Sequence, residues 1–218
     1  MRGVIFDWDG TLADSHSSLY EANAAVMRAL DLPFSPELYR EHYAPDWRLM
    51  YERLGVPADR IDDANRVWEA AFHGTHTSVL LPGVLDAVTR LTGAGVPVGL
   101  VTAGPRAIVE PQMVRLDLAS RIPVRVFGDD QPQQKPDPAP LWRALRALGL
   151  DGVARDTAYL GDAPDDMRMA VAVGAHPVGV VSMLSDEELL RSGGAEVVVD
   201  SVAAWVHHLL GPTASGTA

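Results

Sequence analysis

The stretch Val4-Ile5-Phe6-Asp7-Trp8-Asp9-Gly10-Thr11-Leu12 decides the fold of this chain. An apolar run typical of a buried strand ends in two carboxylates at alternate positions, and a glycine and a hydroxyl residue follow. Because residues i and i+2 of a strand point the same way, Asp7 and Asp9 are expected to face one small space, where they repel each other unless a cation lies between them or they share a proton. Gly10 permits a sharp turn and the approach of a ligand to its N–H. A solvated acidic turn is the alternative, and the rest of the chain decides between the two.

The composition bounds the class of protein. The chain has 218 residues, 47% of them hydrophobic, enough for one large domain or for one domain with an insertion. Its formal net charge of -11 argues against a protein that holds nucleic acid or an anionic membrane by bulk electrostatics. It contains no cysteine, which excludes disulfides and thiolate chemistry. The apolar run near the N-terminus is too short for a signal peptide, and no apolar run approaches the roughly 20 residues of a membrane span. We therefore expect a cytoplasmic protein, and we expect neither nucleic-acid nor membrane partners.

From residue 83 onward, strand-like apolar segments alternate with amphipathic helix-like segments. This alternation predicts a parallel sheet covered by helices on both faces, an α/β fold of Rossmann-like type. The expected strands cover 96–102, 124–127, 157–160, 178–182 and 196–199. The expected helices comprise one that ends near 93–95 and others over 105–116, 138–148, 164–173, 185–192 and 201–210.

The preceding part of the chain has a different pattern. It contains no convincing strand, and apolar residues recur at helical spacing, as in Leu19, Ala22 and Val26. Turn signals at 32–33, 44–45 and 55–57 separate about four helices. An all-helical block inserted after the first strand of an α/β core is interpreted as a cap. We therefore expect an α/β core over 1–14 and 82–210, a helical cap over 15–81 and a disordered tail over 211–218.

Polar side chains follow several of the expected strands, and in an open parallel sheet the strand ends meet at one edge. The residues concerned are Asp7 and Asp9 after the first strand, Thr102 after the second, Lys135 in the loop after the third, and Asp162 and Asp166 after the fourth. Lys135 is the one lysine in a chain with seventeen arginines. Since lysine and arginine are not interchangeable at a phosphate-binding position, this choice favours a functional role for Lys135 over a solvated loop charge.

Three carboxylates in one cleft require a cation. Oxygen ligands at this density, with no His or Cys nearby, suit a hard divalent ion, and Mg²⁺ is the expected one. A cation would keep Asp7 ionised, and a carboxylate can attack phosphorus to form an aspartyl-phosphate. Asp9 is placed to protonate the leaving oxygen and later to take a proton from water. Lys135 and Thr102 would hold the phosphoryl oxygens.

The order Asp-x-Asp-Gly-Thr, strand-end Thr, Lys-Pro and Gly-Asp-x-x-x-Asp resembles the haloacid dehalogenase-like (HAD) hydrolase superfamily, and in particular its phosphoglycolate phosphatase-like members with a helical cap. The resemblance covers about residues 2–210. It implies a phosphoric monoester hydrolase in which Asp7 is the nucleophile and Asp9 the acid/base. It also implies that Mg²⁺ is bound by Asp7, the Asp9 carbonyl and Asp162, with Asp166 nearby or acting through water.

Further positions are candidates for substrate binding. They are Gly10 and Thr11 beside the first motif, Ala103, Gly104 and Arg106 after the second strand, and His16 and Arg48 in the cap. The alternatives are a helix-capping role for His16 and a surface position beside Trp47 for Arg48. Two residues depart from the family pattern: Ala103 stands where many relatives have asparagine, and Ala163 where a hydroxyl residue is usual. We expect retained catalysis, with altered substrate contacts or metal affinity.

The leading hypothesis is a Mg²⁺-dependent phosphatase, monomeric or homodimeric, that acts on a small phosphorylated metabolite such as phosphoglycolate, a sugar phosphate or a nucleotide. A phosphomutase of the β-phosphoglucomutase type is one alternative. A binding protein built on a dead phosphatase core is another, which the sequence opposes because each catalytic position carries a competent residue. A dehalogenase is disfavoured because those relatives generally lack a carboxylate at the Asp9 position, and a phosphonatase because the cap contains no lysine.

Overall fold

The computed structural model describes residues 1–43, 47–75 and 78–211 and divides into two compact units. The first unit comprises Met1–Ala13 and Val79–Ala218, and the second comprises Asp14–Ser78. Of the tail expected over 211–218, all but the first residue lies outside the described residues.

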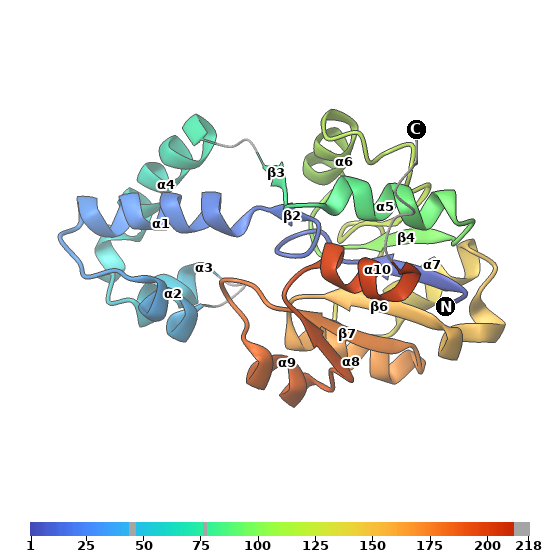
Figure 1. Cartoon of the computed structure of the whole chain (residues 1–218). Coiled ribbons are helices and arrows are strands. Elements are labelled where there is room, and N and C mark those ends of the chain that lie inside the picture. The colour runs from blue at the N-terminus through green and yellow to red at the C-terminus, as the bar shows by residue number, and fades with distance from the viewer. Residues whose placement is uncertain (44–46, 76–77, 212–218) are drawn as a thin grey trace. The chain divides into compact units, whose positions relative to one another are not determined.

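The first unit is built on a parallel six-stranded sheet (Figure 1). Across the sheet the strands are β5 (Val124–Val126), β4 (Val98–Val101), β1 (Gly3–Phe6), β6 (Thr157–Gly161), β7 (His176–Val180) and β8 (Val197–Val199). Phe6 of β1 is in register with Leu100 of β4 on one side and with Leu160 of β6 on the other. The carboxyl end of β1 is therefore flanked by the ends of two further strands, the position at which open α/β sheets bind ligands.

Helices cover both faces of this sheet (Figure 1). One hydrophobic cluster joins one face to α5 (Val84–Gly93), α6 (Arg106–Arg115) and α10 (Val202–Leu210), and a second joins the other face to α7 (Ala139–Ala147) and α8 (Pro164–Val173). The continuous apolar run of β1 serves both clusters, because Val4 and Phe6 belong to the first and Ile5 to the second. Burying each of these side chains stabilises the fold by roughly 1.5–3 kcal/mol.

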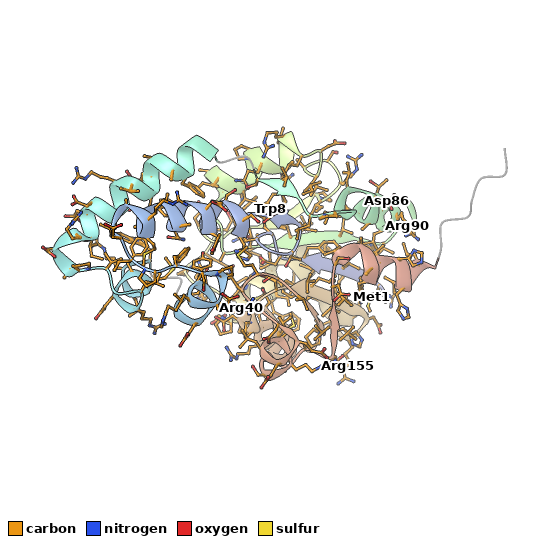
Figure 2. The ribbon with its side chains drawn as sticks, turned by 60° about the vertical axis from the view of Figure 1, so that its left-hand side comes forward. Met1, Trp8, Arg40, Asp86, Arg90 and Arg155 are labelled. Carbon is orange, nitrogen blue, oxygen red and sulfur yellow. The ribbon has the colours of Figure 1, made fainter. Side chains whose placement is uncertain are left out.

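The remaining elements of this unit are short. A 3₁₀ segment (Asp151–Asp156) leads into β6, and α9 (Glu187–Gly193) packs Leu190 against Met167 of α8. Arg90 of α5, labelled in Figure 2, donates a hydrogen bond to the Gly211 carbonyl just after α10. This bond ties the end of the described chain to α5.

The second unit is helical. Its elements are α1 (His16–Ala29), α2 (Pro36–His42), α3 (Trp47–Arg53), a 3₁₀ turn (Ala58–Arg60) and α4 (Ile61–Thr75). The Ser35 hydroxyl accepts a hydrogen bond from the Leu38 N–H at 3.2 Å, and Pro36 follows at a position where its missing N–H costs little, so both residues favour a helix start there. Two short strands form a separate two-stranded sheet: β2 (Ala13–Asp14), which straddles the boundary between the units along the chain, and β3 (Val79–Leu80), which belongs to the first unit.

The expected fold class, a Rossmann-like parallel sheet with an inserted helical block, is confirmed. The expected strands and helices of the first unit are present, with ends that differ by a few residues; β7, for example, begins at His176 and ends at Val180. The turn expected at 44–45 lies outside the described residues. Within the described ranges no helix has the length and apolar character needed to cross a bilayer.

Candidate active site

Asp7 and Asp9 follow β1 at the carboxyl edge of the sheet. The Asp7 N–H donates to the Leu160 carbonyl at 2.8 Å, which continues the pairing with β6 one residue beyond the strand and leaves Asp7 only 6% exposed. Gly10 has a φ of 70°, and its N–H donates to the Ala13 carbonyl at 2.9 Å. The Gly10 N–H, which the sequence analysis considered as a ligand contact, is therefore used by the turn itself.

Lys135 lies between two buried carboxylates. Its Nζ is 2.6 Å from Asp7 Oδ1 and 2.7 Å from Asp166 Oδ1. The three side chains are 11%, 8% and 1% exposed, in the order Lys135, Asp7, Asp166. Hydrogen bonds between ionised groups at these distances are among the strong ones in proteins. The structure thus joins residues from three separate motifs of the sequence.

Asp166 is held by two further hydrogen bonds, one from β6 and one from the turn between β6 and α8. Its Oδ2 accepts from the Ala163 N–H at 3.1 Å, and its Oδ1 accepts from the Tyr159 hydroxyl at 2.9 Å. A Cβ at Gly161 would lie 2.4 Å from Asp166 Cγ, so that position requires glycine. Because the Ala163 backbone makes the contact, the methyl side chain that departs from the family pattern does not remove it.

Tyr159 is a site residue that the sequence analysis missed. Its hydroxyl also lies 3.1 Å from the Val101 carbonyl, and Lys135 Nζ lies 5.7 Å from the centroid of its ring. The residue is fully buried. Its position two residues before Gly161 in a strand was the available signal, because alternate strand residues share a face.

The pKa values follow from burial and from crowded charge. Burial is the main cause that raises the pKa of Asp7 well above its usual value; Asp166, Asp162 and Asp9 add to it and Lys135 opposes it. Burial likewise raises the pKa of Asp166 against the effect of Lys135. Burial lowers the pKa of Lys135, but Asp166 and Asp7 outweigh it, and the net shift is well above the usual value. The lysine therefore stays charged, and the carboxylates remain incompletely compensated.

Asp7, Asp162 and Asp166 fit a divalent cation. Each offers a carboxylate oxygen, these oxygens lie within 4.8 Å of one another, and all three residues are buried. Three carboxylates face one ammonium, and a buried excess of negative charge is costly without a further cation. An all-oxygen donor set of this kind suits Mg²⁺. The contribution of the Asp9 carbonyl to such a site stays a prediction.

Thr102 directly follows β4. Its hydroxyl oxygen accepts from the Gly104 N–H at 2.9 Å, which leaves the hydroxyl hydrogen to be donated elsewhere. A Cβ at Gly104 would lie 3.3 Å from Thr102 Oγ1 and 3.7 Å from Asp9 Oδ2. The absence of a side chain at Gly104 therefore keeps space open beside both groups.

Ala103 packs against the loop that leads to Lys135. The Gly128 N–H donates to the Gly104 carbonyl at 3.0 Å, and a Cβ at Gly128 would lie 2.0 Å from the Ala103 carbonyl oxygen. The Gln134 side chain in turn donates to the Gly128 carbonyl. The backbone between β5 and Lys135 is thus fastened to the loop that follows Thr102.

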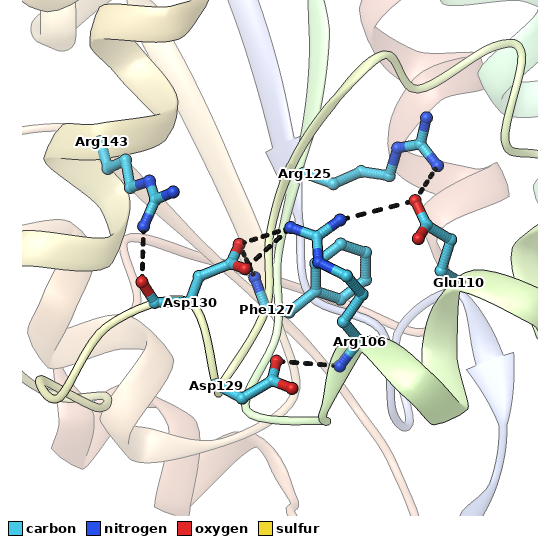
Figure 3. Close-up of polar contacts among 7 residues, drawn as sticks. All are labelled: Arg106, Glu110, Arg125, Phe127, Asp129, Asp130 and Arg143. Carbon is cyan, nitrogen blue, oxygen red and sulfur yellow. Dashed lines mark hydrogen bonds and ion pairs between the residues drawn. The ribbon is translucent and has the colours of Figure 1, made fainter.

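Arg106, a candidate for substrate binding, contacts acidic side chains (Figure 3). Its guanidinium donates to Asp130 at 2.7 and 3.0 Å, lies 3.5 Å from Glu110 and covers the Phe127 ring at 4.2 Å. The backbone N–H of Arg106 donates to Asp129 Oδ1 at 2.9 Å, and this bond satisfies one of the backbone donors that have no partner within the first turn of α6. Arg106 therefore fastens the 127–130 turn in this structure, and its contact with substrate stays a prediction.

The other predicted substrate-binding residues have varied settings. Thr11 is buried, and its hydroxyl has no hydrogen-bond partner among the described residues. His16 and Arg48 belong to the second unit. His16 is the first residue of α1 and is 8% exposed, whereas Arg48 is exposed and its guanidinium lies 4.5 Å from the centre of the Trp47 ring. Their role in substrate binding stays a prediction.

Residues 4–180 match the family model of haloacid dehalogenase-like hydrolases, and the chain belongs to this family. A protein from Yersinia pseudotuberculosis named phosphoglycolate phosphatase is 32% identical over 189 residues, which cover 83% of this chain and 81% of that protein. The comparisons confirm the expected family and the expected enzyme class, a HAD-like phosphatase.

Solved structures support the same fold. A crystal structure described as a "putative beta-phosphoglucomutase" from Thermotoga maritima is 25% identical, with a TM-score of 0.78 over 96% of this chain and 99% of that one. A second, described as a predicted phosphoglycolate phosphatase from Haemophilus somnus, is 19% identical, with a TM-score of 0.75 over 96% of this chain and 98% of that one. At 19% identity, the second shows likeness of fold alone.

Proposed function

We propose that this protein is a Mg²⁺-dependent phosphatase that hydrolyses a small phosphorylated metabolite through an aspartyl-phosphate on Asp7. The observation that carries the proposal is the position of Lys135 between Asp7 and Asp166, with Asp162 within reach of both carboxylates. A buried lysine on a nucleophilic carboxylate is suited to a reaction in which an anion attacks an anion.

In the proposed reaction an Asp7 oxygen attacks phosphorus, and the bond between phosphorus and the ester oxygen breaks. Asp9 donates a proton to the leaving oxygen. Asp9 then takes a proton from water as the water oxygen attacks phosphorus, the bond from phosphorus to Asp7 breaks, and inorganic phosphate leaves. Lys135 and the hydroxyl hydrogen of Thr102 would hold phosphoryl oxygens throughout.

Asp7, Asp162 and Asp166 would hold Mg²⁺, with the Asp9 carbonyl as a further proposed ligand. When bound, the ion supplies positive charge that offsets the carboxylates and the phosphoryl group. Gly10, Thr11, Ala103, Gly104 and Arg106 are proposed to border the phosphate, and His16 and Arg48 of the proposed cap to contact the rest of the substrate. Phosphoglycolate is one candidate substrate, because the Yersinia pseudotuberculosis relative bears that name.

The first test is hydrolysis of an aryl phosphate, followed as release of inorganic phosphate with and without Mg²⁺. Asp7→Asn is expected to lower kcat by about 10³-fold or more, because the nucleophile is removed. Asp165→Asn is the control, since Asp165 lies in the motif of Asp162 and Asp166 but is half exposed and paired with Arg168 at 2.7 Å. Turnover that survives Asp7→Asn, or that needs no metal, contradicts the proposal.

A second candidate is a phosphomutase, favoured by the 25% identity with the Thermotoga maritima structure. The same Asp7 and Asp9 would then return the phosphoryl group to a sugar instead of passing it to water. Incubation with a sugar 1-phosphate separates the two: the 6-phosphate identifies a mutase, and inorganic phosphate identifies a phosphatase. A panel of phosphorylated metabolites then ranks substrates by kcat/KM.

A further inference from the structure

The second unit contains a cavity of about 210 Å³ within its own helices. Its described lining residues come from α1, from α2 and the residue after it, and from α3 and α4, and all of them belong to this unit. Aromatic rings form much of the wall, namely those of Tyr39, Tyr43, Trp47, Tyr51 and Trp68. Its lining combines buried residues, such as Tyr39, with partly exposed ones, such as Trp68, so the cavity is partly open to the surface of the unit. Gaps left by ordinary core packing are rarely larger than a water molecule, and this cavity is much larger.

The aromatic wall is held by ring contacts. The Tyr39 and Tyr43 rings meet edge to face at 5.7 Å between centroids, and the Trp47 and Tyr51 rings do so at 5.8 Å. Tyr39 and Tyr51 are each 1% exposed. Aromatic side chains have few rotatable bonds and prefer these arrangements, so the wall offers a preformed surface for another ring.

One buried amide supplies polarity to the cavity. Asn23 is 2% exposed; its Oδ1 accepts from the Tyr51 hydroxyl at 2.8 Å, and its Nδ2 donates to the Leu19 carbonyl at 2.8 Å. The amide is thereby held in one orientation at the cavity. Such a lining, mostly apolar with a few fixed polar groups, is typical of sites for small molecules.

The part of the lining that the structure describes carries no charge. None of the lining residues in the described part of the chain is an acid, a lysine, an arginine or a histidine. Burial also raises the pKa of Tyr39 and of Tyr51, which keeps both hydroxyls neutral. A phosphate or carboxylate would lose its water there without gaining a partner, so the occupant must present an uncharged group.

We propose that this cavity binds a neutral aromatic ring that carries one hydrogen-bonding group, the chemistry of a small phenol. A cavity of about 150 Å³ accepts benzene, so the volume here leaves room for a substituted ring. The ring would pack against the aromatic wall, and its polar group would face the amide of Asn23. The ring could belong to a free phenol or to the leaving group of a phosphate ester.

Phenol itself is the probe, titrated into the full-length protein by calorimetry, with cyclohexanol as the non-aromatic control. We expect saturable binding of phenol, with a dissociation constant roughly in the millimolar range or tighter for so small a ligand, and weaker binding of cyclohexanol. Leu19→Trp fills the cavity from α1 and should weaken phenol binding about tenfold or more. Ala24→Trp, on the same helix but outside the lining, should leave phenol binding unchanged.

Circular dichroism establishes that each variant is folded. If Leu19→Trp fails to fold, Asn65→Trp fills the cavity from α4 and takes its place. Absence of saturable phenol binding, equal binding by the filled variant, or equal binding of cyclohexanol overturns the proposal.

A kinetic arm, which rests on the proposed phosphatase function, identifies the source of the ring. If the ring is a leaving group, Leu19→Trp lowers kcat/KM for phenyl phosphate and leaves that for ethyl phosphate unchanged. If the ring belongs to a separate ligand, the variant binds phenol weakly but hydrolyses both esters as the wild type does. If neither ester is hydrolysed, the phosphatase proposal fails while the calorimetry still decides on the cavity.

Discussion

Replacement of Lys135 by methionine tests whether the site is held by this one cation. Methionine keeps much of the length and the apolar stem of lysine but removes the charge. Asp7 and Asp166, which Lys135 contacts at 2.6 and 2.7 Å, would remain buried without their common partner. The perturbation therefore leaves two uncompensated carboxylates inside the fold.

The expected cost follows from burial. Breaking a buried ion pair by removing one partner costs about 3–5 kcal/mol, because the other charge stays desolvated, whereas an exposed pair contributes at most about 1 kcal/mol. The two carboxylate side chains here are 8% and 1% exposed, so the larger range applies. With a urea slope of about 2 kcal/mol/M, a loss of about 4 kcal/mol lowers the unfolding midpoint by about 2 M.

The assay is urea unfolding followed by circular dichroism, in a chelator so that no divalent cation takes the place of the ammonium. Without Lys135 the pKa values of the two carboxyls rise further, and a carboxyl whose pKa is higher in the folded state destabilises that state more as pH rises. The difference between variant and wild type should therefore be large near pH 7 and smaller near pH 5. Arg168→Met is the control, since its pair with Asp165 is 54% and 49% exposed.

Two results would refute the reasoning. One is a midpoint shift for Lys135→Met no larger than that of the Arg168→Met control. The other is a difference that grows as pH falls, which would mean that the carboxyls are not the groups left uncompensated.

Three further predictions concern neighbouring positions. Gly161→Ala should lower both stability and activity, because its Cβ would lie 2.4 Å from Asp166 Cγ. The control Gly152→Ala, whose Cβ would enter open space, should change neither; unfolding curves measure the stability and kcat the activity. Arg106→Ala should cost at most about 1 kcal/mol near neutral pH, because the Arg106 side chain is 44% exposed. Burial raises the pKa of Asp130, but the Phe127 N–H and Arg106 outweigh it and hold that pKa below its usual value. The cost should therefore be lost as the pH falls through this lowered pKa, as urea unfolding across pH can show. Asp162→Asn should reduce the increase in melting temperature that Mg²⁺ produces, measured by thermal unfolding across metal concentrations.

The strand ends could be predicted because the residues that determine them are neighbours in the sequence. An apolar run buried on both faces, followed by carboxylates and a glycine, indicates a central parallel strand and a turn wherever it occurs. The lone Lys135 stood out for a similar reason, since a chain that otherwise uses arginine has no compositional cause to place a lysine there. The structure places Lys135 against Asp7, two residues 128 positions apart in the chain.

The partners of Arg106 and of Asp166 could not be predicted in the same way. Arg106 begins a helix near the strand ends, which is also a suitable position for a contact with an anion. No pattern in the neighbouring sequence indicates that the chain folds back and brings Asp130 to Arg106. Tyr159 reads as an ordinary buried strand residue, and its hydroxyl gains a role only when the next helix brings Asp166 to 2.9 Å. In both cases the deciding contact lies across a loop whose path is set by tertiary packing.

The charges at this edge of the sheet link the binding of a cation to the binding of phosphate. Asp7, Asp162 and Asp166 outnumber Lys135, and the guanidinium of Arg106 already pairs with Asp130. A phosphate ester that entered such a site alone would meet an excess of negative charge in a chain whose net charge is already -11. A divalent cation bound first would remove that excess, so phosphate should bind more tightly in its presence, and by linkage the cation should bind more tightly in the presence of phosphate. The proposed dependence on Mg²⁺ is thus a consequence of having one lysine among three carboxylates, before any step of the chemistry begins.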